Sequence, residues 1–401
     1  MSTRSIAHPL IRAVLPGVLF MAAVFAAAAA RGADAEATRA AQILADAGVR
    51  GGLVVHLGCG DGRLTAALGA SENVVVHGLG TDAAAVAAAR RRIRGLGRYG
   101  RVSVERYDGR RLPYADHLVN LLVADALAAV PREEVLRVLV PGGTALVGDE
   151  RILKPPRPGT DEWTHYLHDA SGNAVAHDDV VGPPRRVQWV AAPRHARSHE
   201  HLPSINAVVT SAGRIFYFRD AGPIGRVEQP AEWHLVARDA HNGLLLWRRK
   251  FDPWFPHIVN WGQTPPLLQR RLVADGDRVF ATLGLHAPLS VLDARTGETQ
   301  KTYEGTAGTE EILFHKGILL LAGREVADDR EAELRRWREL QRRPDSPVFE
   351  RDSADPFVNR LRKTENTGGR FLLALDADSG RVLWRKEKKD ARGLRPLTLA
   401  A

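Results

Sequence analysis

The segment VVHLGCGDGRL, residues 54–64, decides the fold of the N-terminal part of the chain. Apolar residues run up to Leu57, three glycines follow at alternate positions (Gly58, Gly60 and Gly62), and a helical pattern begins directly after them. This order predicts a buried strand, a tight loop and a helix N-terminus. Glycines in such a loop let backbone N–H groups approach a ligand closely, because no Cβ stands in the way.

Helical and strand patterns alternate on both sides of this segment, from about residue 36 to 150. The expected strands are the apolar runs 52–57, 73–79, 102–107, 118–125 and 143–149. Alternation of this kind predicts an α/β domain with a Rossmann-like parallel sheet and helices on both faces. The proline-rich KPPRPG then breaks the pattern, so we expect the sheet to end at the fifth strand and the domain to span 36–152.

Three motifs of this domain resemble class I AdoMet-dependent methyltransferases. The glycines of 58–62 match the GxGxG loop, RYDGRRLPY (106–114) matches the segment after the third strand, and VLVPGG (138–143) matches the turn before the fifth. The resemblance implies S-adenosylmethionine as the cofactor. It places the loop at the methionyl end of the cofactor and Asp108 on the adenine amine.

Two positions depart from the family pattern. Gly80 stands where the family has an acidic residue that binds both ribose hydroxyls, and His56 stands where an acidic residue is common in the first strand. The loss of a charge-assisted pair of hydrogen bonds costs about 2–4 kcal/mol, or roughly 30- to 1000-fold in affinity. Asp82 is the nearest carboxylate that could substitute. We therefore expect a weakened site built from Gly58, Gly60, Gly62, Asp82 and Asp108, with no catalytic residue assigned.

The second part of the chain has a different character, with short apolar strands and frequent glycines. Strand–turn–strand patterns at 207–218, 271–284 and 311–323 predict antiparallel hairpins. Three segments also align without gaps: ARDAHNGLLLW (237–247), VLDARTGETQK (291–301) and ALDADSGRVLW (374–384). We interpret each as a tight turn in which Asp caps backbone amides and Gly takes a positive φ, with the final Trp packed between neighbouring units. Lys301 stands at the Trp position of the middle copy.

These repeats resemble the blade signature of quinoprotein-type β-propellers. Residues 161–189 also look like a first blade, with Trp163, Asp169, Asn173 and Trp189 in the expected order. The resemblance implies an incomplete all-β propeller over 153–401, interrupted by a charged helical insertion at about 325–368. Non-enzymatic relatives use such blades as platforms, so the implied ligand is a protein or a saccharide. Pyrroloquinoline quinone and calcium are not expected, because a single cysteine cannot form the vicinal disulfide usual in that family.

The N-terminus carries Arg4 and Arg12, an apolar run at 13–30, and the sequence ADA at 33–35. This is typical of a cleaved export signal, which predicts a periplasmic or secreted protein. A retained membrane anchor is the alternative.

Charge and histidine content support no further class of partner. The net charge of +9 comes from Arg spread over the whole chain, and only eight of the 56 basic residues are Lys, so nucleic-acid binding is not expected. Six histidines lie in a segment that reads as a polar loop (165, 168, 177, 195, 199 and 201), and no metal site is predicted. Cys59 is interpreted as a small loop residue rather than a catalytic thiol.

Three functions follow as expectations. The first is an exported binding or scaffold protein with a degenerate methyltransferase-like domain. The alternative is an active AdoMet-dependent methyltransferase, and the second alternative is a quinone-dependent oxidoreductase.

Overall fold

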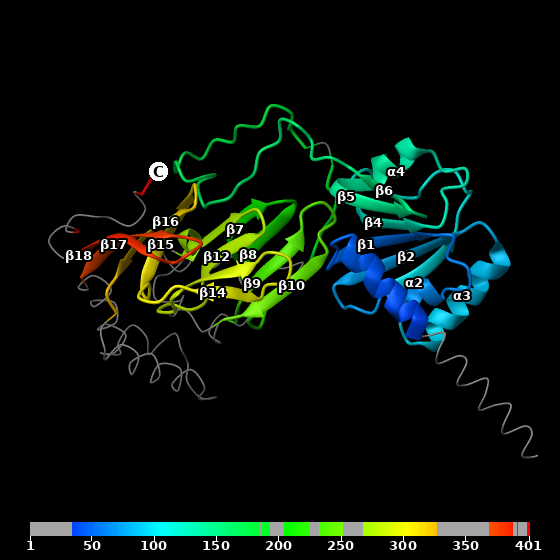
Figure 1. Cartoon of the computed structure of the whole chain (residues 1–401), viewed down its shortest axis with the longest axis horizontal. Coiled ribbons are helices and arrows are strands. Elements are labelled where there is room, and N and C mark those ends of the chain that lie inside the picture. The colour runs from blue at the N-terminus through cyan, green and yellow to red at the C-terminus, as the bar shows by residue number, and fades with distance from the viewer. Residues whose placement is uncertain are drawn as a thin grey trace, which may run out of the picture. The chain divides into compact units, whose positions relative to one another are not determined.

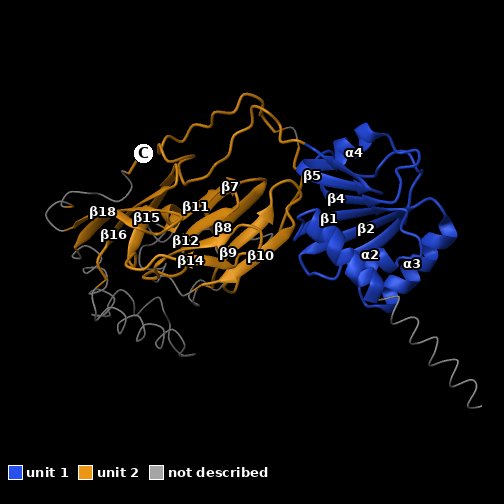
Figure 2. Cartoon of the chain, in the orientation of Figure 1, with its two compact units in different colours: residues 1–154 blue, residues 155–401 orange. Residues whose placement is uncertain are grey.

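The computed structural model describes residues 34–184, 186–192, 204–224, 232–251, 268–326, 369–387, 391 and 399–401. The chain divides into two compact units, Met1–Lys154 and Pro155–Ala401 (Figure 2). The apolar run of the predicted export signal and nearly all of the predicted helical insertion lie outside the described residues. Within those residues, no helix is long and apolar enough to span a membrane.

Unit 1 contains one six-stranded sheet in the order β3-β2-β1-β4-β5-β6 (Figure 1). Its strands are β1 (Gly52–Leu57), β2 (Val74–Gly80), β3 (Val102–Arg106), β4 (Val119–Ala124), β5 (Leu139–Val147) and β6 (Glu150–Leu153). Its helices are residues 34–46, α2 (Arg63–Leu68), α3 (Ala83–Gly95) and α4 (Arg132–Val138). Strands β1 to β5 pair in parallel, which confirms the predicted Rossmann-like sheet.

Both faces of this sheet are buried, as its nearly continuous apolar strands require. Successive residues of β1 point to opposite faces, so Val54 packs in one core with α2 and α3, and Val55 packs in another with α4. The helices therefore cover the sheet on both sides.

The expectation that the sheet ends at the fifth strand is wrong. β6 turns back through Gly148 and pairs antiparallel with β5, from Thr144↔Leu153 to Val147↔Glu150. Four residues are too few to display a strand period before the prolines begin, which is why the pattern did not reveal this edge strand.

In its described residues, unit 2 contains three four-stranded antiparallel sheets (Figure 1). The first is β7 (Ile205–Ser211), β8 (Arg214–Asp220), β9 (Trp233–Asp239) and β10 (Leu245–Lys250). The second is β11 (Leu272–Asp275), β12 (Arg278–Thr282), β13 (Leu289–Asp293) and β14 (Thr299–Thr302), preceded by the 3-10 turn η2 (Leu268–Arg271). The third is β15 (Thr309–His315), β16 (Ile318–Arg324), β17 (Arg370–Asp376) and β18 (Val382–Glu387). The three predicted hairpins are confirmed as β7–β8, β11–β12 and β15–β16.

The first strands of the three sheets adjoin, because β11 lies beside both β7 and β15. One apolar core joins the first and second sheets, and includes Phe216 and Leu272. A second core joins the second and third sheets, and includes Phe280 and Phe371. The sheets are thus consecutive, similar packing units.

The repeated segments form the predicted turns between the third and fourth strand of each sheet. The aspartates, Asp239, Asp293 and Asp376, each accept backbone N–H bonds from residues two or three positions ahead. The glycines, Gly243, Gly297 and Gly380, have φ values of 71°, 74° and 77°. The interpretation of these segments as Asp-capped turns with a positive-φ glycine is therefore confirmed.

Two tryptophans of unit 2 pack on its repeated turns. The indole of Trp247, in the first sheet, lies 2.7 Å from the position of a Cβ on Gly297, and its Nε1 donates to Ala294 O at 2.9 Å. Trp189 stands in the same relation to Gly243. The predicted packing of the repeat tryptophan is thus confirmed for Trp247 but not for Trp384, which is 43% exposed among the described residues.

The expected first blade at 161–189 does not form a sheet. Among the described residues of this segment there is no strand, only an isolated bridge between His165 and His168. The backbone of Trp163 and Thr164 instead bonds to β7 and β11 of the sheets that follow.

Candidate functional site

The candidate site of unit 1 lies where the parallel strands end. The glycine loop follows β1, Asp82 follows β2, Asp108 follows β3 and Asp125 follows β4. Carboxyl ends of parallel strands share one edge of a sheet, and the strand order reverses between β1 and β4. Open α/β sheets bind ligands in the crevice at such a reversal.

The three loop glycines are all in the left-handed region but serve different purposes. Their φ values are 74° for Gly58, 49° for Gly60 and 81° for Gly62. A Cβ on Gly62 would come within 2.9 Å of the Ala89 Cβ, so this glycine lets α2 approach α3. A Cβ on Gly58 would meet nothing within 4 Å, and one on Gly60 only the Gly58 carbonyl at 3.9 Å. Exposed backbone with free space in front of it is what a cofactor loop requires.

At the end of β2, Gly80 lies in a tight apolar contact. A Cβ there would stand 2.9 Å from Val86 Cγ2 and 3.2 Å from Cys59 Sγ. Gly80 has no positive φ, so close packing rather than backbone conformation keeps this position small. A carboxylate at residue 80 requires Val86 to move.

Cys59 is one of the side chains that leave little space beside both glycines of β2, together with Val104 at Gly78 and Val86 at Gly80. Its buried side chain also lies 2.9 Å from the position of a Cβ on Gly78. Burial raises the pKa of the Cys59 thiol, which keeps it protonated and unreactive. The alternating glycines of HGLG, residues 77–80, are the sequence feature that could have indicated this close contact between Cys59 and β2.

Asp82 caps α3. Its Oδ1 accepts a 2.8 Å bond from Ala84 N, and the side chain is exposed. One oxygen is therefore engaged by the helix terminus, and no ligand role for Asp82 follows from this contact alone.

Asp108 forms a similar local turn. Its Oδ1 accepts backbone N–H bonds from Arg110 at 2.8 Å and Arg111 at 3.0 Å. These bonds hold the pKa of Asp108 below its usual range, so it is a carboxylate at neutral pH. The residue is exposed after β3, where the sequence placed it for an adenine amine.

His56, which departs from the resembled pattern, is a buried ring. It lies inside β1, its Nδ1 lies 2.8 Å from Thr65 Oγ1, and burial lowers its pKa to about 4. Asp125, the only polar candidate that the sequence offers after the fourth strand, lies outside β4 in an exposed ion pair with Arg39 at 3.0 Å. Within the loop itself, Asp61 pairs with Arg63 at 3.0 Å and with Arg92 at 3.4 Å.

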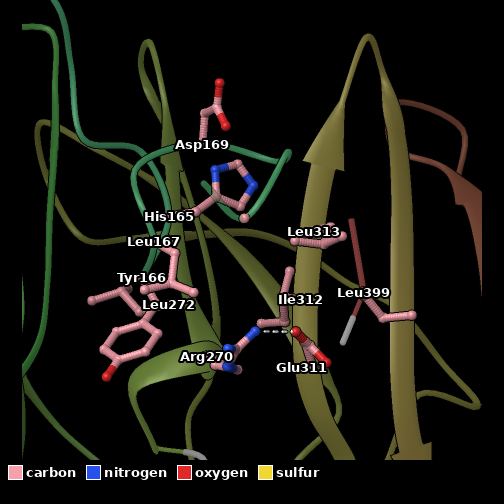
Figure 3. Close-up of a pocket in the computed structure, with 11 residues that line it drawn as sticks. His165, Tyr166, Leu167, Asp169, Arg270, Leu272, Glu311, Ile312, Leu313 and Leu399 are labelled. Carbon is pink, nitrogen blue, oxygen red and sulfur yellow. Dashed lines mark hydrogen bonds and ion pairs between the residues drawn. The ribbon is translucent and has the colours of Figure 1, made fainter. Parts of the chain in front are cut away.

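Unit 2 contains a small cavity of about 20 Å³, the volume of roughly one water molecule. Figure 3 shows Arg270 and Glu311 paired at one side of it, with His165 and Asp169 at the other. The Arg270–Glu311 distance is 2.5 Å, and the Glu311 side chain is fully enclosed. This charge pair belongs to the junction of η2 with β15.

Residues 54–143 match a protein family described as "Methyltransferase domain". Unit 1 contains a methyltransferase-like domain. The match spans the glycine loop, the segment after β3 and the turn that begins β5, which are the three motifs that carried the resemblance.

Solved structures with a similar fold are the [4+2]-cyclase SpnF, a geranyl diphosphate methyltransferase in complex with SAM, and geranyl diphosphate C-methyltransferase from Streptomyces coelicolor A3(2). Their identities to this chain are 24%, 23% and 22%, with TM-scores of 0.25, 0.25 and 0.26. Each likeness covers 27% of this chain, and 43%, 47% and 44% of the other. The chain thus spans less than half of each of these proteins. A comparison with curated protein sequences found no match.

Proposed function

We propose that the chain is an exported binding protein whose methyltransferase-like domain retains its cofactor loop but binds S-adenosylmethionine weakly. The end of β2 carries this proposal. Gly80 occupies the position of the ribose-binding carboxylate and is packed against Val86 and Cys59. Without that carboxylate the site loses about 2–4 kcal/mol, which takes a micromolar site to about 0.03–1 mM.

The remaining residues fit parts of the cofactor. Free space in front of Gly58 and Gly60 suits the methionyl end, and the exposed carboxylate of Asp108 suits the adenine amine. For the ribose, Asp82 is the carboxylate that follows β2, but it caps α3 with one of its oxygens. S-adenosylmethionine would supply an electrophilic methyl group, and the residues named here would only hold and orient it.

An active AdoMet-dependent methyltransferase is the second candidate. The open glycine loop and the ionised Asp108 favour it. It requires Asp82 to bind the ribose despite its capping role, and it requires the protein to stay where the cofactor is made. Cell fractionation tests the latter point, because a cytosolic chain would contradict export.

For unit 2 we propose the first blades of a quinoprotein-type propeller that serves as a platform for a protein or a saccharide. Adjoining first strands and aromatic residues docked on successive Asp–Gly turns support this assignment. Quinone chemistry is not part of the proposal, because a chain with one cysteine lacks the disulfide found in that family.

Calorimetry of S-adenosylmethionine binding to the full chain tests the proposal. Gly58→Ala fills the space in front of the loop, and Gly97→Ala is its matched control. Both glycines have positive φ, at 74° and 65°, and both have free space around a Cβ, so the backbone cost is the same.

We expect wild-type binding weaker than about 30 μM, abolished by Gly58→Ala and unchanged in Gly97→Ala. Wild-type binding at about 1–10 μM, with the same response to the two variants, would overturn the weak site and favour the active enzyme. Equal effects of the two variants would contradict a cofactor role for the loop.

A further inference from the structure

A strap at the start of unit 2 is held by all three of its sheets. The carbonyl of Trp163 accepts from β7, the carbonyl of Thr164 accepts from β11, and Nε2 of His165 accepts from the backbone of β15. These bonds are 2.7, 3.0 and 3.1 Å long. These bonds fix the positions of Trp163, Thr164 and His165, from which the next residues of the chain extend.

The chain then reverses and brings three metal-binding side chains together. His168 has a φ of 72°, and its carbonyl accepts from His165 N at 3.0 Å, which closes the reversal. This places Nε2 of His168 2.6 Å from Oδ2 of Asp161. The backbone N–H of His177 donates to the same oxygen at 2.7 Å. One ligand atom from each of these three residues lies within 4.8 Å of those of the other two.

The buried ring of His168 has an unsatisfied nitrogen. Its side chain is only 3% exposed and packs edge-on against the rings of Trp163 and His177. Nδ1 makes no hydrogen bond to any part of the chain that the structure describes, and Asp169 Oδ2 lies 3.7 Å away. If Nε2 carries the proton toward Asp161, Nδ1 turns a bare lone pair toward the carboxylate of Asp169. A cation on Nε2 reverses this, because Nδ1 then carries the proton and faces Asp169 with it. Histidine ligands of metals commonly show this arrangement.

We propose that Asp161, His168 and His177 bind a divalent transition-metal ion, with Zn²⁺ as the reference metal. Two imidazole nitrogens and one carboxylate oxygen are a donor set that suits Zn²⁺ and its first-row neighbours. Bonds of about 2.0–2.2 Å place neighbouring ligand atoms about 3–3.5 Å apart. The Asp161–His168 pair needs to open by less than about 1 Å to reach that spacing, and the exposed His177 needs only to swing inward.

The backbone holds the carboxylate of Asp161 in place. Its Oδ2 accepts the N–H of His177 at 2.7 Å, and its Oδ1 accepts the N–H of Glu162 at 2.7 Å. Asp161 and His177 are exposed, which leaves the remaining coordination positions to water or to a bound molecule. An open three-ligand site of this kind differs from a closed structural zinc site.

A doubly protonated His168 between two carboxylates is the competing explanation, and it requires no metal. The test is a titration of the chelator-treated full chain with Zn²⁺ by calorimetry, and with Co²⁺ by visible absorption. His177→Ala and Asp161→Asn remove ligands that are exposed, so the fold is retained. His234→Ala, on β9, is the matched control because it deletes an imidazole outside the cluster.

We expect about one equivalent of bound metal, a visible Co²⁺ spectrum, and an affinity that falls at least tenfold in both ligand variants but not in His234→Ala. No saturable binding would overturn the proposal in favour of the protonated histidine. Binding that survives His177→Ala and Asp161→Asn would also overturn it, because the metal would then reside elsewhere.

Discussion

The hydroxyl of Tyr303 donates a 2.6 Å hydrogen bond to the carbonyl oxygen of Ala377. That carbonyl directly follows the aspartate of the third repeated turn. In the first two turns the equivalent carbonyls, of Ala240 and Ala294, accept from tryptophan indoles at 3.0 and 2.9 Å. Tyr303 therefore supplies the bond that the tryptophan makes elsewhere, from two residues beyond Lys301.

Replacing Tyr303 with Phe should lower the free energy of unfolding of unit 2 by about 1–3 kcal/mol, because it leaves the buried carbonyl of Ala377 without this partner. All eight tryptophans lie in unit 2, so urea unfolding followed by tryptophan fluorescence reports on this unit. Tyr166→Phe is the control: Tyr166 is 40% exposed, and its change should stay within about 0.5 kcal/mol. Equal effects of the two substitutions would show that the Tyr303 bond does not stabilise the turn.

Gly297 should tolerate alanine far less than Gly276 does. Both have positive φ, at 74° and 55°, but only at Gly297 would the new methyl group enter the ring of Trp247, at 2.7 Å. The backbone cost of about 1–2 kcal/mol is shared, and overpacking adds about 1–3 kcal/mol at Gly297 alone. Urea midpoints of the two variants measure the difference. Midpoints that coincide would mean that Trp247 moves freely and is not docked on the turn.

The features that were predictable from sequence are those set by neighbours along the chain. A glycine loop after a buried strand, alternation of elements in unit 1, and an Asp–Gly turn that repeats in unit 2 each leave a local pattern. In the structure, these patterns correspond to the parallel strands β1 to β5 and to the capped turns at Asp239, Asp293 and Asp376.

The features that sequence analysis missed depend on contacts between distant residues. Tyr303 makes the hydrogen bond that a tryptophan makes at the other two turns, but it stands two residues after the tryptophan position of the repeat. A gapless alignment therefore does not reveal it. His168 contacts Asp161 from a chain reversal in which it takes a positive φ, a conformation that no motif signals for a histidine. The tight space at Gly80 likewise depends on Val86 of α3 and on Cys59 of the loop.

A carboxylate at residue 80 should restore S-adenosylmethionine affinity only when space is made for it. Gly80→Asp alone places its Cβ 2.9 Å from Val86 Cγ2, so we pair it with Val86→Ala and use Val86→Ala alone as the control. The double variant should bind the cofactor about 30- to 1000-fold more tightly than the control, in line with about 2–4 kcal/mol for the added bonds. Calorimetry on the full chain measures both. A double variant that binds no better than the control would mean that the end of β2 does not face the ribose.

The buried imidazole of His56 should make unit 1 less stable in mild acid. Its pKa is about 4 in the folded chain and 6.5 in the unfolded chain, so between these values only the unfolded chain takes up the proton. The free energy of unfolding of unit 1 is therefore not reduced by His56 above pH 6.5, and it decreases as the pH falls from 6.5 toward 4. Between pH 7 and pH 5 the loss is about 2 kcal/mol.

His56→Asn keeps a polar group near Thr65 but cannot titrate, so the difference between pH 7 and pH 5 should shrink by about 2 kcal/mol. The buried thiol of Cys59 is the only cysteine and lies in unit 1, so its reactivity toward a disulfide reagent that works below pH 6 follows the unfolding of this unit in urea. His77 titrates in the same direction and is present in both proteins, which is why the comparison uses the difference between them. An unchanged pH dependence in His56→Asn would contradict this prediction and assign the acid sensitivity of unit 1 to other groups, His77 among them, rather than to the buried ring of β1.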